Sequence, residues 1–501
     1  MIPYKTIIKI DKSSRQPVYI QLTNQFIDLI KKRTLAPNAK LPGTRTLAEL
    51  IGLHRKTVVA CYEELLLQGW IASIPQKGTY VHGDIPELQQ QKIGELETVE
   101  KSAKTGFSFT QNPIFNRKYP QSFSEDYMYV NDGVSDVRLA PSNEIAILYR
   151  KVVSKKSSIK QMNYGTTYGN MELRETLVAY LNETRGLAIT TDHIIITRGS
   201  QMGMFLASQL LFKNQEYIII GETNYSSSDT TFKSAGAKLL RAKVAKDGLD
   251  VEAIERLCKK YPVKAIYTTS HHHHPTTVTL SAEKRMKLLN LAKNYNLAII
   301  EDDYDYDFHY NHAPILPLAS HDKNNNVIYV GSICKTVAPV YRIGYLIASK
   351  AFVDECAKLR RFIDRQGDAL LELAFSKFIK EGSLDRHVKK VVKLYKSRRD
   401  LFCSLLKSEL GDYFSFEIPK GGMAIWVTLN AKYSWDRVAE VGKTQGIILS
   451  EWQRYDMIGA GHNAIRMGFA AYNETEIRSF MARLKKTMNI VASVEVNSLE
   501  K

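Results

Sequence analysis

Between residues 194 and 331 the sequence alternates short apolar runs with stretches of helical periodicity. The apolar runs are IIIT (194–197), YIII (217–220), AIYTT (265–269), LAIIE (297–301) and VIYVG (327–331). This alternation is typical of a mostly parallel β-sheet whose crossover helices cover its faces, so we expect an α/β fold. From about residue 390, a long basic helical pattern, broken strands and a closing helix predict a smaller α+β domain packed on the sheet domain.

Composition and charge narrow the class of protein. The chain has 501 residues, of which 44% are hydrophobic, and its 69 Lys and Arg against 52 Asp and Glu give a formal net charge of +17. The length predicts about three domains, and the charge favours a polyanionic partner such as nucleic acid. We expect no membrane span and no signal peptide, because no long apolar stretch is present. Five scattered cysteines without a CxxC pair indicate a reducing compartment, and we expect a cytoplasmic protein.

A shift in composition after Gly83 divides the chain. Residues 85–122 are polar, rich in Gln, Lys and Glu, and lack sustained periodicity, which predicts a flexible linker. We therefore expect a compact basic domain over 1–84, the linker over 85–122, a large sheet domain over 123–390 and a small domain over 391–501.

The segment 17–69 is expected to contain three helices. The first covers 17–33, the second runs from Thr44, which caps it, to Gly52, and the third follows from His54. Two short helices joined by a glycine-containing turn match a helix-turn-helix, whose second helix can lie in the major groove of DNA. The alternative is a small helical bundle with basic tips.

A predicted β-hairpin follows these helices and favours the winged form of the motif. Residues 70–74 and 79–81 have strand character on either side of a Pro-Gln-Lys-Gly turn, which places a lysine at the tip. In such domains the first turn of the preceding helix points at base edges and phosphates. This turn consists of His54, Arg55, Lys56 and Thr57.

Four short motifs in the rest of the chain are candidates for chemistry. Lys335 ends an apolar strand among small residues, where loss of hydration makes an amine nucleophilic. Asp302 ends a neighbouring strand and could hold a pyridinium ring protonated. Residues 196–203 place a small-residue turn at the start of a helix, which can bind a phosphate. Arg466 lies in an apolar strand, where a carboxylate is its natural partner.

Each motif also has a plainer interpretation. Lys335 could be an ordinary lysine after a strand, and Arg466 could form a structural salt bridge. The turn at 196–203 resembles many strand-to-helix loops, and the acidic strand end after Ile300 resembles a magnesium-binding tip. The four histidines 271–274 look like a metal cluster, but consecutive side chains of an extended segment alternate in direction, so we expect no metal site.

The stretch LPGTRTLAELIGLHRKTVVACYEELLLQGWIASIPQKGTYV resembles the DNA-binding domains of the GntR type. Helix caps, turn and wing occur in the same order, and the resemblance implies binding to a double-stranded DNA operator. At the position of His54 that family usually has a small hydroxyl residue. The DNA-contacting positions implied by the resemblance are Arg45, His54, Arg55, Lys56, Thr57, Lys77 and Gly78.

The order and spacing of the four motifs resemble fold-type-I aminotransferases over roughly 125–495. With the GntR-type head, the whole chain is similar to the MocR/GabR family of transcription regulators. The resemblance implies that pyridoxal 5′-phosphate (PLP) forms an internal aldimine with Lys335, that Asp302 holds its ring nitrogen, and that Arg466 binds an effector carboxylate. It also implies a homodimer, in which Tyr164 reaches the phosphate of the partner subunit. The other cofactor contacts that it implies are Ser200, Gln201, Tyr225, His274, Tyr304, Ser332 and Arg342.

Two departures from the aminotransferase pattern favour a regulator over an enzyme. His274 stands where aminotransferases usually carry an asparagine, and Tyr304 follows Asp302 by two residues rather than three, a spacing that the regulators share. The expected function is a PLP-dependent transcription regulator that senses an amine, an amino acid or PLP itself. Two alternatives stay open: a working aminotransferase with a tethered DNA-binding head, and a repressor whose aminotransferase fold has lost the cofactor.

Overall fold

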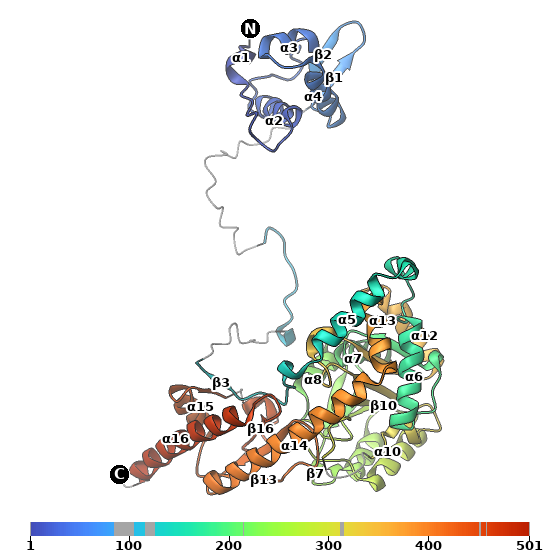
Figure 1. Ribbon diagram of the computed structural model, residues 1–501, viewed down its shortest axis with the longest axis vertical. Coiled ribbons are helices and arrows are strands. Elements are labelled where there is room, and N and C mark those ends of the chain that lie inside the picture. The colour runs from blue at the N-terminus through green and yellow to red at the C-terminus, as the bar shows by residue number, and fades with distance from the viewer. Residues whose placement is uncertain are drawn as a thin grey trace. The chain divides into compact units, whose positions relative to one another are not determined.

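The computed structural model divides the chain into two compact units, Met1–Thr110 and Gln111–Lys501 (Figure 1). The structure describes residues 2–84, 105–115, 126–213, 215–310, 315–449, 452–456 and 458–499. Most of the predicted linker, 85–104 and 116–122, lies outside the described residues. Within the described ranges, each helix is too short or too polar to cross a bilayer.

The first unit folds as a winged helix-turn-helix around its own core. Its core packs Phe26 between Tyr4 and Tyr62, with ring centroids 6.1 and 6.0 Å apart. The wing is an antiparallel pair in which Ile71 lies opposite Val81. The elements are α1 (Tyr4–Ile7), α2 (Val18–Lys31), α3 (Thr44–Ile51), α4 (Arg55–Leu67), β1 (Ile71–Ile74) and β2 (Gly78–Val81).

The ends of the two helices of the motif are set by local chemistry. Gly52 ends α3 in the left-handed conformation with φ +67°, as the sequence predicted. The predicted cap Thr44 is instead the first helical residue, and Gly43 precedes it without a side-chain cap. His54 caps α4, because its Nδ1 accepts a hydrogen bond from the backbone N–H of Lys56 at 3.3 Å.

The second unit is built on a seven-stranded sheet with the order β4-β12-β11-β10-β9-β5-β6. All neighbouring pairs are parallel except those of β12, which is antiparallel to both β11 and β4. The five predicted runs are strands, and two further strands, β6 and β12, complete the sheet. The strands are β4 (Ile194–Thr197), β5 (Tyr217–Gly221), β6 (Lys238–Ala242), β9 (Val263–Thr268), β10 (Ala298–Asp303), β11 (Val327–Ser332) and β12 (Gly344–Ile347).

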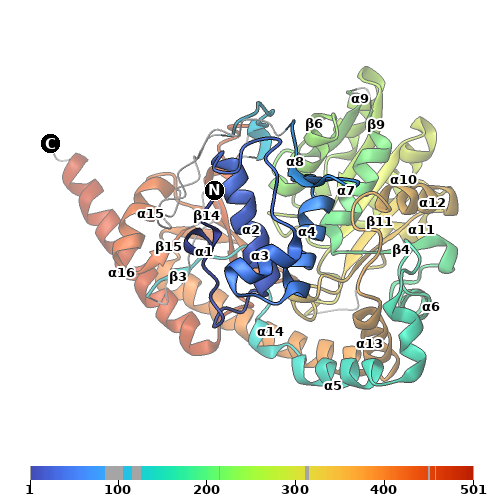
Figure 2. The ribbon, with the colours of Figure 1, turned by 90° about the horizontal axis from the view of Figure 1, so that it is seen from above.

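Helices bury both faces of this sheet, which confirms the predicted α/β class. In β4, Ile194 and Ile196 pack with α6, α9, α10 and α13, whereas Ile195 packs with α7, α8 and α12. Two buried faces explain why the strands are continuous apolar runs. Figure 2 shows α5 and α13 side by side along one flank. These helices are α5 (Ser142–Val153), α6 (Met171–Arg185), α7 (Ser200–Leu211), α8 (Ser226–Ser234), α9 (Val251–Lys260), α10 (Ala282–Tyr295), α11 (Leu318–His321), α12 (Lys350–Arg360) and α13 (Ala369–Lys380).

The carboxy-terminal part forms the predicted smaller α+β layer with a separate core. Its antiparallel sheet has the order β13-β14-β16. The predicted boundary at residue 390 falls inside α14, which is continuous from the large to the small part. The elements are α14 (Ser383–Leu410), β13 (Phe414–Phe416), β14 (Ala424–Leu429), α15 (Trp435–Thr444), β16 (Ala464–Gly468) and α16 (Glu474–Leu499), with short pairs formed by β3 (Met128–Tyr129) and β15 (Ile447–Ile448) and by β7 (Val244–Ala245) and β8 (Gly248–Leu249).

Candidate functional site

A cavity of about 360 Å³ lies at the carboxyl ends of the parallel strands of the large sheet. Parallel strands end at one edge, so motifs far apart in the sequence converge there. Nine of the ten predicted cofactor residues line this cavity: Lys335, Asp302, Tyr304, Ser200, Gln201, Tyr225, Ser332, Arg342 and His274.

Arg342 reaches this edge because of a strand that the sequence analysis missed. It lies two residues before the start of β12, whose first residue, Gly344, pairs with Ser332 and with Thr197. Since β12 is antiparallel to its neighbours, its amino end lies where the parallel strands have their carboxyl ends. Arg342 therefore arrives beside Ser332 and the start of α7.

Asp302 presents an unused hydrogen-bond acceptor to the cavity. Its Oδ2 accepts a hydrogen bond from the hydroxyl of Tyr267 at 2.9 Å, whereas its Oδ1 has no hydrogen-bond partner among the described residues. Burial raises the pKa of this carboxyl to about 7. Because buried polar atoms are normally hydrogen-bonded, this carboxylate oxygen would be satisfied by a cationic N–H group bound in the cavity.

Lys335 lies three residues after the end of β11 and lines the cavity. Its Nζ donates a hydrogen bond to the carbonyl oxygen of Gly133 at 2.8 Å. Burial lowers the pKa of this amine, which increases the fraction that is neutral and nucleophilic.

One end of the cavity is suited to an anion. The backbone N–H groups at the start of α7, at Ser200 and Gln201, lie beside the Arg342 guanidinium and Ser332. The turn requires glycine, since Gly199 has φ +79° and a Cβ there would lie 2.8 Å from Nη2 of Arg342.

Three aromatic residues line the other walls. The rings of Tyr225 and His274 meet edge-on with centroids 5.1 Å apart. The hydroxyl of Tyr304 donates to the carbonyl oxygen of His272 at 2.9 Å. Nε2 of His274 hydrogen-bonds Oδ2 of Asp132 at 2.9 Å, and burial lowers the pKa of the imidazole.

Arg466, predicted to bind an effector carboxylate, is fully buried behind the cavity wall. Its guanidinium donates to the carbonyl oxygens of Asp132 (3.2 Å) and Pro275 (3.0 Å) and to the hydroxyl of Tyr304 (3.3 Å). Its Nε also lies 3.6 Å from Oδ1 of Asp132. The nearest carboxylate to this arginine is thus one that the chain itself supplies.

Tyr164, the tenth predicted cofactor residue, lies outside the cavity. Its ring is 75% exposed and stacks with the Arg365 guanidinium at 4.1 Å. This position fits the expectation of a residue that serves a partner subunit, which stays a prediction.

The four histidines 271–274 are buried but have different partners. Nδ1 of His272 contacts Oδ1 of Asp305 at 2.9 Å, Nδ1 of His273 contacts Thr276, and His274 contacts Asp132. In the part of the chain that the structure describes, no three His, Cys, Asp or Glu side chains are grouped as metal ligands.

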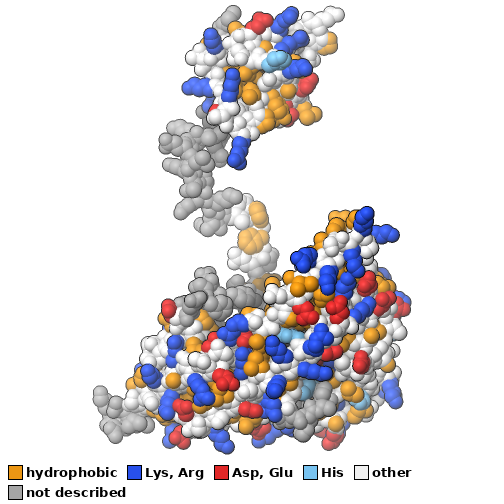
Figure 3. Space-filling view, in the orientation of Figure 1, with side chains coloured by type: hydrophobic (Ala, Val, Ile, Leu, Met, Phe, Trp, Pro, Cys, Tyr) orange, Lys and Arg blue, Asp and Glu red, His pale blue; other side chains and the backbone are white. Residues whose placement is uncertain are grey.

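The predicted DNA-contacting side chains lie on the surface of the first unit. Arg45 lies on α3, the His54–Thr57 turn begins α4, and Lys77 and Gly78 form the wing tip. All are exposed except Thr57, which is half-buried. Figure 3 shows Lys and Arg side chains across this unit. Among the described residues, none pairs with Arg45, Arg55, Lys56 or Lys77 as a counter-ion.

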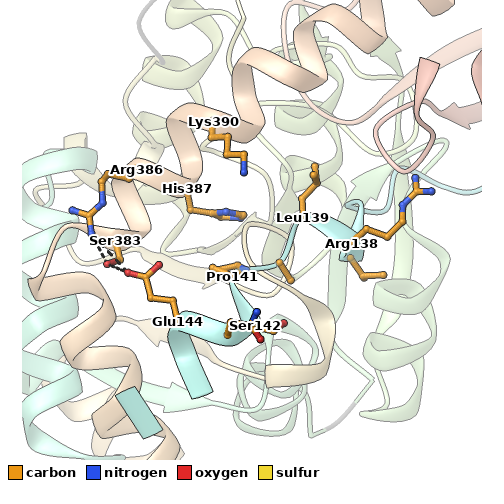
Figure 4. A pocket seen from close by; sticks show the side chains of 12 residues that line it. Arg138, Leu139, Pro141, Ser142, Glu144, Ser383, Arg386, His387 and Lys390 are labelled. Carbon is orange, nitrogen blue, oxygen red and sulfur yellow. Dashed lines mark hydrogen bonds and ion pairs between the residues drawn. The ribbon is translucent and has the colours of Figure 1, made fainter. Parts of the chain in front are cut away.

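A second cavity of about 630 Å³ lies where α5 and α14 begin (Figure 4). Arg386 donates to Ser383, and Ser383 donates to Glu144. Nε2 of His387 hydrogen-bonds the carbonyl oxygen of Thr336 at 2.9 Å. Since Thr336 follows Lys335, this contact ties α14 to the loop that carries the cavity lysine.

Among the residues that line the first cavity, sequence reasoning missed Tyr267 and Asp132, which contact predicted site residues. Tyr267 lies in a predicted strand. Its hydroxyl, near the end of an apolar run, was the sequence feature that could have indicated a site residue. Asp132 belongs to no recognisable motif, because its neighbours in space are more than 140 positions away in the sequence.

Comparison with known proteins agrees with both units. The family model described as aminotransferase class I and II matches residues 139–489, and that of the bacterial regulatory proteins of the gntR family matches residues 19–81. The chain belongs to the MocR/GabR family of transcription regulators. The predicted fold-type-I class and GntR head are thereby confirmed.

Two relatives of this MocR/GabR regulator match along nearly its whole length. It is 25% identical over 459 residues to the uncharacterized HTH-type transcriptional regulator YdfD of Bacillus subtilis, covering 92% of this chain and 94% of the relative. It is 24% identical over 481 residues to the probable rhizopine catabolism regulatory protein MocR of Rhizobium meliloti, covering 96% and 95%. Among solved structures, Pyrococcus horikoshii kynurenine aminotransferase, determined with PMP, superposes with a TM-score of 0.68 at 25% identity over 73% of this chain and 91% of the other.

Proposed function

We propose that this regulator binds PLP at Lys335 and senses an amine or amino-acid effector in the same cavity, while its head binds a double-stranded DNA operator in the cytoplasm. The observation that supports this most is Oδ1 of Asp302, a buried acceptor without a donor among the described residues. It shares a cavity with the Lys335 amine and with the anion-binding start of α7. PLP has a basic ring nitrogen for Asp302, an aldehyde for the Lys335 amine and a phosphate for the start of α7.

Different residues of the cavity would bind different parts of the cofactor. Asp302 would hold the ring nitrogen, and Tyr225, His274 and Tyr304 would bound the ring. The phosphate would bind at the anion-binding end, formed by Ser200, Gln201, Ser332 and Arg342. When bound, PLP supplies an aldehyde that condenses with amines and a ring that withdraws electrons.

Lys335 would bind the cofactor covalently, and an incoming amine would take the place of Lys335. Its lowered pKa favours the neutral amine, and the Gly133 carbonyl oxygen accepts a hydrogen bond from it. Where the effector is an amino acid, Arg466, next to the hydroxyl of Tyr304, is the cation that could hold its carboxylate, in competition with Asp132.

The helix α14 offers a route by which the state of the cavity can move the small domain. Its first turns contact Thr336 through His387, and its later turns pack on α16 in the small domain. Replacement of Lys335 by an effector alters the loop to which α14 is attached. The resulting change in DNA binding is limited by the difference in effector affinity between the two domain arrangements.

A homodimer is supported by apolar side chains left on the surface of the second unit. Val340 is 78% exposed and Phe362 88% exposed, and Tyr164 stacks on Arg365, three residues after Phe362. Exposed apolar groups of this size are typical of protein interfaces. Val340 lies two residues before Arg342, so a partner at this surface would adjoin the cavity.

The proposal is tested by titrating the purified regulator with PLP, reducing it with borohydride and mapping the adduct by mass spectrometry. We expect a visible absorbance band and a pyridoxyl group on the peptide that contains Lys335. DNA footprinting with and without amines that change this band then tests regulation. Sustained turnover of an amino donor and a 2-oxo acid without selective DNA binding would identify an aminotransferase instead, and the absence of an adduct would identify a cofactor-free repressor.

The recognition-helix assignment predicts a change in salt dependence. Arg55→Ala and Lys56→Ala should weaken operator binding, and each phosphate contact that is lost should reduce the slope of log Kd against log salt by about one. Fluorescence anisotropy over a range of salt concentrations measures this slope. Lys32→Ala, at the end of α2 and outside the motif and wing, is the matched control. An unchanged slope in both variants would contradict the assignment.

A further inference from the structure

We propose that Asp132 determines the class of ligand that the cavity accepts. Its carboxylate takes the place beside Arg466 that the carboxylate of an amino acid would need, so the cavity prefers amines without a carboxylate next to the amino group. This inference rests on the proposed function of the cavity and narrows it.

The carboxylate of Asp132 lines the cavity and is held by four side chains. Its Oδ2 lies 2.9 Å from Nε2 of His274 and 3.8 Å from Nη2 of Arg454. Its Oδ1 accepts a hydrogen bond from the hydroxyl of Tyr455 at 2.8 Å and lies 3.6 Å from Nε of Arg466. Contacts from both sides define one position for this group.

The surroundings of Asp132 favour the ionised form of its carboxyl. Burial raises the pKa of its carboxyl, but His274, Arg466 and Arg454 outweigh burial and hold this pKa well below its usual range. The cavity wall therefore carries an anionic group that is already paired with Arg454 and Arg466.

A ligand carboxylate would have to displace this charge to reach Arg466. The guanidinium is enclosed and already donates to the backbone carbonyl oxygens of Asp132 and Pro275 and to the hydroxyl of Tyr304. Seating a second carboxylate there would place two like charges together in a buried site or force Asp132 away from its partners. Both changes cost free energy, because buried charges depend on their counter-ions.

A protonated amine, unlike a carboxylate, is attracted by the Asp132 side chain. The Lys335 amine bonds to the carbonyl of Gly133, the next residue in the chain, so an amine that replaces Lys335 arrives beside the Asp132 carboxylate. A protonated amine is attracted by this charge before it reacts. Asp132 thus favours the cationic group of a ligand and opposes its carboxylate.

A matched pair of probes separates the two effects. Pentylamine and norleucine differ by one carboxylate on the carbon that bears the amine. We expect the PLP-loaded wild type to bind pentylamine about tenfold more tightly than norleucine. The absorbance change of bound PLP and isothermal titration calorimetry measure the two Kd values independently of any turnover.

The substitution Asp132→Asn should abolish this preference by improving norleucine binding. Asparagine keeps the size of the side chain and can accept the bond from Tyr455, but it carries no charge. Asp354→Asn is the matched control, since Asp354 also accepts a bond from a tyrosine, Tyr168 at 2.8 Å, and pairs with Lys350, but lies on α12 outside the cavity. The control should retain the wild-type ratio.

The outcomes distinguish this inference from the proposed function. A wild type that fails to load PLP overturns both. A wild type that loads PLP but binds norleucine as tightly as pentylamine overturns the inference alone. So does an Asp132→Asn protein that loads PLP and keeps the wild-type ratio, and the wild-type comparison decides the matter if that variant does not fold.

Discussion

Replacing Lys335 with alanine should abolish the visible absorbance of bound PLP and leave operator binding without effector unchanged. Among the residues that line the cavity, Lys335 alone carries a primary amine, so no other side chain there can form the covalent bond. DNA binding should persist because the head has its own core, composed of residues between Ile2 and Val81. Absorbance spectra at saturating PLP and fluorescence anisotropy with operator DNA measure the two properties.

The same experiment shows whether the two units have separate roles. Lys350→Ala, which changes an exposed lysine on α12, should keep both the absorbance and DNA binding. In Lys335→Ala, the response of DNA binding to amines should also disappear. Persistent covalent attachment of PLP in this variant would refute the role of Lys335. Loss of operator binding in a well-folded Lys335→Ala protein would show that the head depends on the cofactor.

Replacing Asp302 with asparagine should stabilise the cofactor-free protein at alkaline pH and weaken PLP binding. Burial raises the pKa of Asp302 from 3.8 to about 7, so the folded state binds this proton more tightly than the unfolded state. The folded protein consequently loses stability as pH rises from about 4 to about 7. About three pKa units correspond to about 4 kcal/mol, which is an upper bound on the gain, because asparagine does not ionise.

Urea unfolding of the second unit at pH 4 and pH 8 measures this effect. The gain in free energy of unfolding should be present at pH 8 and absent at pH 4. With PLP present the gain should shrink, since the ionised carboxylate of the wild type would pair with the ring nitrogen, a bond worth about 1.5–3 kcal/mol. An Asp302→Asn protein that binds PLP as tightly as the wild type would contradict the assignment of Asp302, whatever its stability.

Much of the site follows from where the strands end. The runs that end before Ser200, Asp302 and Lys335 are visible in the sequence, and parallel strands bring their carboxyl ends to one edge. Arg342 was matched by resemblance alone, because β12 is short and its direction is opposite to that of its neighbours. Its place beside Ser332 depends on a pairing that no local pattern encodes.

The sequence by itself determined the elements that rest on local periodicity and local chemistry. The wing, the left-handed end of α3 at Gly52 and the buried strands of the sheet depend on neighbours a few positions apart. The tertiary structure alone decided that Asp132 lies beside Arg466 and that Oδ1 of Asp302 lacks a donor among the described residues. The physical reason is that the charge and hydrogen bonds of a buried side chain depend on residues hundreds of positions away, which only the folded chain brings within reach.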